Sequence, residues 1–401
     1  MTQVDEVASE PPAEQDSTPR GWLGVGAVAA ATFTVVTSEM LPVGLLTPMS
    51  DGLRVSEGTA GLTLTVTGVV AAVSAPLLTS GLGRFDRRWV FGGLLAVLVL
   101  GNLGAAWSPN FGVMVLARVL VGIGMGGVWA MAAAVAVRLV PPKSAGSATS
   151  LVFSGVAVAS VLGIPAGAFI GALAGWRMAF AAAAGLALLV LVVAAVLLPG
   201  LPADRVVSLG GVLGLAGNPR VRTGLLIVAF LVTGHFAAYT YVRPVLEEVS
   251  GARSEMIGVL LLVYGIAGVV GNFVAGSSVA RAPRTTLVAI STVLAITVIV
   301  LPALGGSMLV AGLLMVVWGL AYGGVSVSSL TWVVAGAPDF REGVSALLTS
   351  VFNAAIAMGA LVGGFAADGI GITAAMWLGG GLAGAALLTA AFGQAPAGGR
   401  L

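Results

Sequence analysis

Long apolar runs recur along the whole of this 401-residue chain, separated by short polar stretches. A helix that crosses the hydrocarbon core of a bilayer needs about 20 mostly apolar residues. Hydrophobic residues make up 58% of the chain and charged residues only 8%, whereas soluble domains are about 25% charged. An all-α integral membrane protein is therefore expected. We place its twelve transmembrane helices at residues 22–47, 58–80, 89–107, 111–137, 146–172, 176–198, 223–245, 256–279, 285–304, 307–335, 344–367 and 373–392.

The basic residues are distributed unevenly between the two sides of these spans. If both termini lie on the inner side, only Arg54, Arg177 and Arg253 fall near outer ends, and nearly all the others fall near inner ends. Cytoplasmic segments carry the excess of basic residues, so both termini are expected in the cytoplasm. Residues 1–20, with five acidic residues and two adjacent prolines, are predicted to form a disordered cytoplasmic tail. Residues 394–401 form a second, short tail.

The chain divides into two halves of similar length. The longest polar interruption, residues 199–222, is a predicted cytoplasmic linker between six-helix bundles at 21–198 and 223–393. Shifting the sequence by 197 residues brings like residues together, namely Arg84 with Arg281, Arg87 with Arg284, Gly122 with Gly319, Gly126 with Gly323, Gly146 with Gly343 and Gly167 with Gly364. Parallel repeats of six spans, with a binding site near the midplane between them, are an architecture of secondary transporters.

Three ionisable residues lie at membrane depth. Glu39 is inside the first span, Arg118 is about a third of the way into the fourth, and Arg243 lies near the end of the seventh. A charge at that depth is costly, so each is a functional-site hypothesis. Arg118 either faces inward or extends to an interface. Arg243 either pairs with Glu39, or shares a polar substrate with it, or pairs at the outer interface with Glu247 or Glu248, one turn away.

Polar and aromatic side chains gather in the second half of the chain. The seventh span contains the only His, His235, together with Tyr239 and Tyr241. Such groups supply hydrogen bonds and stacking surfaces for a polar aromatic substrate. Asp368 is expected to cap a helix end. The candidate substrate-binding residues are Glu39, Trp129, His235, Tyr239, Tyr241, Arg243, Trp332 and Asn353, and the candidate proton-coupling residues are Glu39, Arg118 and Arg243.

Two further motifs lie in the first half. The loop after the second span carries Arg84, Asp86, Arg87 and Arg88, and we assign it as a gating loop. The fifth span carries Gly163, Pro165 and Gly167, and a proline within a helix frees a backbone carbonyl and bends the helix. The glycines of 122–127 resemble a nucleotide-binding loop, but no strand precedes them, so helix packing is the better interpretation.

These motifs resemble those of the major facilitator superfamily. The inner loop is similar to its signature between the second and third spans, although Gly83 replaces the signature Asp, and Asp86 is the acid available there. The fifth-span run is similar to the antiporter signature. Similarity to purine ribonucleoside efflux proteins of the drug:proton antiporter branch covers nearly the whole chain, on residues 39–49, 55–61, 86–88, 129–131, 138–142, 175–177 and 239–244.

The resemblance implies a proton-coupled antiporter in the bacterial inner membrane that exports purine ribonucleosides or their analogues. The alternative is a multidrug, antibiotic or sugar exporter of the same superfamily. The expected partners are a small-molecule substrate, protons and the lipid bilayer, with the protein acting as a monomer. No nucleic acid is expected, because no basic face is concentrated anywhere. No enzyme activity, cofactor or metal is expected, since the chain has a single His and no Cys.

Overall fold

The computed structural model describes residues 19–81, 85–141, 144–202, 214–279 and 281–394. Arg84, the middle of the linker and most of both predicted tails lie outside these residues. The last two residues of the predicted N-terminal tail, Pro19 and Arg20, belong to the first helix. Twelve helical stretches are long and apolar enough to cross a membrane, which confirms the prediction. The helices of the first half are α1 (Pro19–Leu53), α2 (Glu57–Gly81), α3 (Arg87–Ala106), α4 (Phe111–Val137), α5 (Ala145–Val158), η2 (Ala159–Gly163), α6 (Ile164–Ala174) and α7 (Trp176–Leu197).

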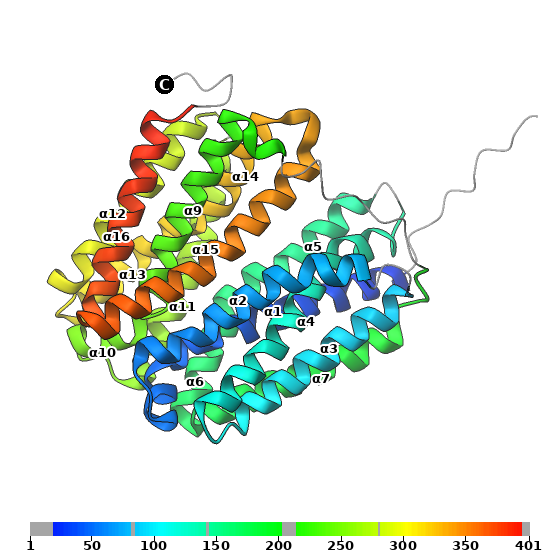
Figure 1. Ribbon diagram of the computed structural model, residues 1–401, viewed down its shortest axis with the longest axis horizontal. Helices are drawn as coiled ribbons and strands as arrows, with labels where there is room; N and C mark the ends of the chain where they lie inside the picture. The colour runs from blue at the N-terminus through cyan, green and yellow to red at the C-terminus, as the bar shows by residue number, and fades with distance from the viewer. Residues whose placement is uncertain (1–18, 82–84, 142–143, 203–213, 280, 395–401) are drawn as a thin grey trace, which may run out of the picture.

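The second half repeats this plan. Its helices are η3 (Leu215–Gly217), α9 (Pro219–Tyr239), α10 (Val242–Ser250), α11 (Ser254–Val279), α12 (Pro283–Leu304), α13 (Met308–Gly323), α14 (Val325–Gly336), η4 (Pro338–Phe340), α15 (Arg341–Gly369) and α16 (Ile372–Phe392). Most spans agree with the expected ranges to within a few residues. Figure 1 shows the two bundles leaning against each other, with α2 and α15 side by side between them.

Three spans are interrupted rather than straight. A bend was expected in the fifth span, whereas single helices were expected in the seventh and the tenth. The fifth span passes through the π-type turn η2 just before Pro165, whose missing N–H cannot bind the Val161 carbonyl. The seventh breaks between α9 and α10, where Pro244 leaves the Thr240 carbonyl free. The tenth divides into α13 and α14 at Gly324.

Glycines place corresponding helices against each other in the two halves. Gly122 and Gly126 on α4 lie against the backbone of α2, and Gly319 and Gly323 on α13 lie against the backbone of α11. A side chain at any of these positions would collide with that backbone. The sixth span of each half begins after a turn with positive φ, at Gly175 and at Gly371. These equivalent contacts confirm the twofold repeat.

Apolar packing also joins the halves. One cluster of buried side chains lies entirely within the first half, on α1, α2, α3, α4, α5 and α7. A larger one fills the second half and extends onto α1 and α2 through residues such as Met40, Val43 and Leu64. The first helix is therefore buried on all sides, and a charged residue on it is enclosed by protein.

Candidate functional site

Glu39 lies in the middle of α1 and is 4% exposed. Three residues further along the helix, Pro42 lacks the N–H that would bind the Ser38 carbonyl. Arg118 of α4 takes that place, since its Nη1 donates to Ser38 O at 2.8 Å and its Nη2 donates to Glu39 O at 2.9 Å. The proline thus creates an acceptor, and a buried guanidinium satisfies it beside the Glu39 carboxyl.

Arg118 also joins α2 to this arrangement. Its Nε donates to Thr63 O at 3.2 Å, and its side chain is fully buried. The alternative of an arginine that extends to the membrane surface is therefore wrong. Among the described residues, no side chain donates a hydrogen bond to the Glu39 carboxylate, but the charges of Glu39 and Arg118 act on each other. Arg118 is therefore the cation whose charge acts on the Glu39 carboxyl group, although the two side chains share no hydrogen bond.

Arg243 repeats the same chemistry between the two halves. Pro48 leaves the Gly44 carbonyl of α1 without its helical donor, and Arg243 Nη1 donates to that oxygen at 2.6 Å. Its Nε binds Glu247 Oε1 at 2.9 Å, and its Nη2 donates to Ser254 Oγ at 3.1 Å. Of the alternatives open in the sequence, the structure selects the pair with Glu247. The alternative contact with Glu39 does not form, because Arg243 reaches α1 five residues further along, about 7–8 Å by helical rise.

Polar contacts around Arg243 connect the halves at one end of the molecule, and we call this set the outer latch. Glu247 Oε2 accepts a hydrogen bond from Thr47 Oγ1 at 2.6 Å. Nearby, Asp368 of α15 caps the start of α2, where it accepts from Ser56 Oγ at 2.6 Å and from Gly58 N at 3.0 Å. This is the helix-end role expected for Asp368, performed across the interface. The outer latch lies at the ends of α1 and α2 furthest from the chain termini.

Replacement of Arg243 should open the outer latch. Arg243→Ala removes the donors to Gly44 O and Ser254 and leaves Glu247 without its cation, although Thr47 still donates to it. Arg243→Lys keeps the charge without the guanidinium's reach to three partners. The chain has no cysteine, so spin labels can be placed at Asp51→Cys on α1 and Glu248→Cys on α10, both exposed. We expect a longer label-to-label distance to be populated most in the Ala variant and less in the Lys variant.

The matched control for this measurement is Arg177→Ala. Arg177 lies at the same end of the molecule, but its contacts with Ser108 O and with the Trp176 ring are both within its own half. Its replacement should leave the distance distribution as in the parent protein. Unchanged distances in both Arg243 variants would contradict the role of the outer latch.

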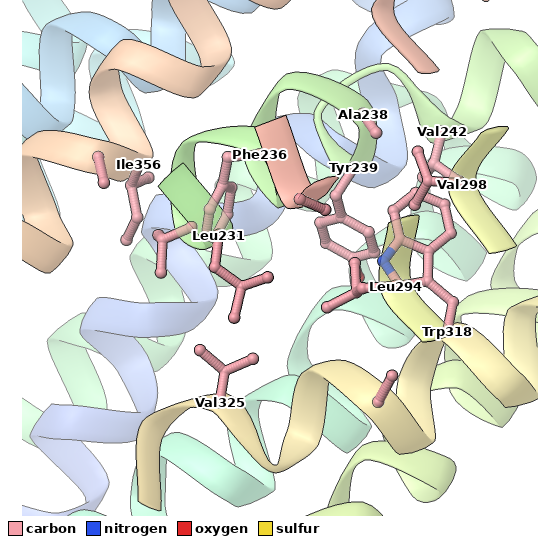
Figure 2. Close-up of a cluster of buried hydrophobic side chains, with 14 of the residues drawn as sticks. Leu231, Phe236, Ala238, Tyr239, Val242, Leu294, Val298, Trp318, Val325 and Ile356 are labelled. Carbon is pink, nitrogen blue, oxygen red and sulfur yellow. The ribbon is translucent and has the colours of Figure 1, made fainter. Parts of the chain in front are cut away.

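Two of the predicted binding residues belong to a stack of aromatic rings in the second half. His235 and Tyr239 of α9 lie with ring centroids 4.9 Å apart and planes 21° apart. Trp318 of α13 meets both rings edge-on, and Figure 2 shows it next to Tyr239. Tyr241, by contrast, is fully buried at the outer latch, where its hydroxyl donates to Ala360 O at 2.7 Å and its ring lies against Gly61 and Gly364. The structure therefore gives Tyr241 a packing role.

The remaining predicted binding residues lie apart from one another. Trp129 is partly buried, packs against the apolar clusters of both halves, and has no hydrogen-bond partner for its Nε1 among the described residues. Asn353 lies half-buried on α15. Trp332 is fully buried near the start of α9, where its Nε1 donates to Arg220 O at 3.2 Å. Of the three, Trp129 alone packs against both apolar clusters through a partly exposed side chain.

The predicted gating loop fastens helix ends within the first half. Asp86 caps α3 by accepting from Arg88 N at 2.8 Å and also accepts from Leu201 N at 3.0 Å. Arg88 Nη2 donates to Ala195 O at 2.5 Å, near the end of α7, and Arg87 contacts the Met131 sulfur at 3.8 Å. These bonds tie the start of α3 to the segment that follows α7.

Asp86 should make a pH-dependent contribution to stability. Its pKa is lowered, first by the Leu201 N–H and then by the Arg88 N–H, which stabilise the carboxylate. A depressed folded-state pKa means that the stabilisation is complete above the ordinary pKa of about 4 and is lost as the pH falls through the folded value. We expect Asp86→Ala to lower the melting temperature of detergent-solubilised protein at pH 7, and this difference to shrink as the pH falls below the ordinary pKa of an aspartate. A difference independent of pH would contradict this.

The predicted antiporter motif packs the fifth span tightly onto α1. A Cβ at Gly163 would collide with Thr37, and one at Gly167 would collide with Leu41. Pro165, which follows the π-type turn, is buried. The same turn also contacts α11 of the other half. The motif thus lies beside the α1 segment that carries Glu39.

Comparison with known proteins assigns the family. The sequence model of the Major Facilitator Superfamily matches residues 28–348. The chain belongs to the major facilitator superfamily. The protein is therefore a transporter rather than an enzyme.

The chain is similar over most of its length to transporters of known name. The chain is 33% identical over 359 residues to the purine ribonucleoside efflux pump NepI of Escherichia coli (strain K12), which covers 90% of this chain and 91% of that protein. It is 34% identical over 361 residues to NepI of Salmonella paratyphi B, with the same coverage. The crystal structure of the nucleoside transporter NupG superposes with a TM-score of 0.72 at 15% identity, covering 93% and 98% of the two chains, and this likeness concerns the major facilitator fold alone.

Several residues of the site were not predicted from the sequence. Pro42 and Pro48 signal free carbonyls at Ser38 and Gly44, four residues before each, and this spacing could have indicated acceptors for buried arginines. Trp318 and Tyr322 carry no such signal, because apolar aromatic residues are common in membrane helices. Their contacts with the His235 ring depend on how the helices of the second half pack together.

Proposed function

We propose that this chain is a proton-coupled exporter of purine ribonucleosides or their analogues, working as an antiporter. The observation that carries the proposal is Glu39, a carboxyl group enclosed between the halves beside Arg118 and without a side-chain hydrogen-bond donor among the described residues. The curated relatives named as purine ribonucleoside efflux pumps support the substrate class. We further propose that the protein resides in the bacterial inner membrane as a monomer, with both termini in the cytoplasm.

The proposed cycle uses Glu39 as the proton carrier. When the site opens outward, Glu39 takes a proton and becomes neutral, which removes its attraction to Arg118. When the site opens toward the cytoplasm, Glu39 releases the proton, and the substrate binds next to the charged pair. Because Arg118 is fastened to α1 and α2 by backbone hydrogen bonds, the loss or gain of a proton is felt by both helices. Protonation and substrate binding then exclude each other, as antiport requires.

The contacts of the outer latch fit one stage of this cycle. The polar contacts described between the halves lie at the end opposite the chain termini. With the termini in the cytoplasm, as proposed, this arrangement corresponds to a protein closed toward the outside. Opening would require Arg243 to release Gly44 O and Asp368 to release α2. The loop of Asp86 to Arg88 would fasten the opposite end in the other state.

The test is transport by purified protein in liposomes. We expect an imposed pH gradient, acidic on the side of proton entry, to drive radiolabelled inosine against its concentration gradient, and a protonophore to abolish this movement. Parallel assays with ethidium and with xylose examine the drug and sugar alternatives. Transport of either compound without transport of inosine would replace the nucleoside assignment, and inosine transport insensitive to the protonophore would contradict proton coupling.

A further inference from the structure

Four aromatic rings from three helices of the second half form a group of stacked pairs, in which His235 also lies 6.3 Å from Tyr264 at 18°. Tyr322 of α13 lies on His235 with centroids 3.4 Å apart and planes 10° apart. His235 lies next to Tyr239, and Tyr239 lies 4.8 Å from Tyr264 of α11 at 28°. Trp318 meets His235, Tyr239 and Tyr264 edge-on. We call the four stacked rings, with Trp318 at their edge, the aromatic column; Figure 2 shows Tyr239 and Trp318 of this set.

Both ring nitrogens and both faces of His235 are occupied by neighbouring side chains, so little of the ring can contact a substrate. Its Nδ1 lies 3.0 Å from Trp318 Nε1, and an indole N–H can only donate, so Nδ1 must be the acceptor. The imidazole proton is then on Nε2, which faces the Tyr264 hydroxyl at 3.5 Å. Tyr322 and Tyr239 flank its two faces, and the residue is 1% exposed. His235 is therefore held as one neutral tautomer inside the column.

Tyr322 is the accessible member of the aromatic column. His235, Tyr239 and Tyr264 are all buried, whereas Tyr322 is partly exposed. Its ring stacks only on His235 among the described residues, and Phe236 meets it edge-on. The Tyr322 hydroxyl also lies within electrostatic reach of Glu39 on the opposite half. Tyr322 thus connects the column to the side of the interface that carries the carboxyl group.

We propose that Tyr322 is the specificity-determining residue of the second half, which stacks on the planar base of the substrate, and that His235 is a positioning residue that orients the Tyr322 ring. The inference rests on the proposed nucleoside function. Stacking on an aromatic side chain tolerates any base but requires a flat ring. The site should therefore discriminate nucleosides from the free sugar through Tyr322, and not through a hydrogen bond from His235.

The first experiment measures equilibrium binding of inosine, adenosine and ribose to purified protein. Tyr322→Leu should weaken binding of both nucleosides by about tenfold or more and leave the weak binding of ribose unchanged. Tyr322→Phe, which keeps the ring, should bind nearly as well as the parent. The matched control is Trp377→Leu, which removes an exposed aromatic ring of α16. Equal nucleoside affinities for Tyr322→Leu and the parent would overturn the role of Tyr322 and leave the proposed function standing. A parent protein that binds no nucleoside would overturn the proposed function.

The second experiment separates positioning from contact at His235. Gln can accept the hydrogen bond from Trp318 through Oε1, whereas Leu cannot. We expect His235→Gln to keep both the preference for nucleosides over ribose and the pH profile of transport, and His235→Leu to lose the preference. A pH profile shifted in His235→Gln would overturn the assignment of a neutral histidine.

A third measurement needs no variant of the column. Photolysis of the parent protein with 8-azidoadenosine should label the peptide that contains Tyr322, and excess inosine should prevent the labelling. Labelling confined to peptides of the first half would overturn the role of Tyr322, even if its variants failed to fold.

Discussion

Glu39→Gln should abolish inosine export driven by a pH gradient, reducing it to the level of liposomes without protein. Gln matches Glu in size, so the enclosed position on α1 and the backbone bonds of Arg118 to Ser38 and Glu39 are preserved. What is lost is a group that can take up and release a proton within the membrane. Binding of inosine should be weaker than in the parent and independent of pH, because the neutral amide resembles the protonated carboxyl group, which disfavours the substrate in the proposed cycle.

The measurements that check this are counterflow and gradient-driven transport on the same liposomes. Counterflow exchanges labelled for unlabelled substrate without net proton movement, so Glu39→Gln should keep counterflow at substrate concentrations high enough to offset its weaker binding. The matched control Glu248→Gln should keep both activities. Glu248 is exposed on α10. Full gradient-driven transport by Glu39→Gln would eliminate Glu39 as the proton carrier.

Arg118→Met should destabilise the protein and stop transport. The substitution leaves the carbonyls of Ser38, Glu39 and Thr63 without their charged donor in a fully buried site. Hydrogen bonds to a charged group contribute about 1.5–3 kcal/mol each, and an unpaired buried Glu39 carboxylate would add a further cost. We expect a clear fall in the melting temperature of the detergent-solubilised protein. The melting temperature of Arg177→Met, which loses one carbonyl contact to Ser108 and the contact with the Trp176 ring, should fall much less.

A double substitution tests whether the proline is the reason that α1 needs Arg118. Pro42→Ala restores an N–H that can bind Ser38 O within the helix. Combined with Arg118→Met, it should recover part of the lost melting temperature, so the two effects should not add. Simple additivity of the two substitutions would mean that the free carbonyl does not explain the position of Arg118.

The sequence was sufficient for much of the fold. Apolar length set the spans, because a membrane helix must satisfy all its backbone groups internally and therefore needs a continuous run of about 20 apolar residues. The repeat of Gly122 and Gly126 in Gly319 and Gly323 correctly indicated equivalent helix contacts. The breaks in the seventh and tenth spans were missed, since a short helix interruption hardly changes the mean hydropathy of a span.

The candidate site could be predicted only in part. Depth in the membrane identified Glu39, Arg118 and Arg243 as unusual, but depth does not say which way a side chain points. Arg243 has Glu247 one turn away on its own helix, and that pair formed in preference to one with Glu39. Tyr241 and Trp332 look like binding residues in the sequence, yet their polar atoms bind backbone carbonyls within the second half.

By itself, therefore, the sequence determined that this protein is a twelve-helix membrane protein of two repeats, with a carboxyl group where a carboxyl group is costly. Tertiary structure alone decided which partners each charge has, because partners are chosen by the facing sides of helices distant in the chain. Arg118 and Arg243 both bind carbonyls that prolines of α1 leave free. That choice depends on how α4 and α10 pack against α1, and hydropathy does not record it.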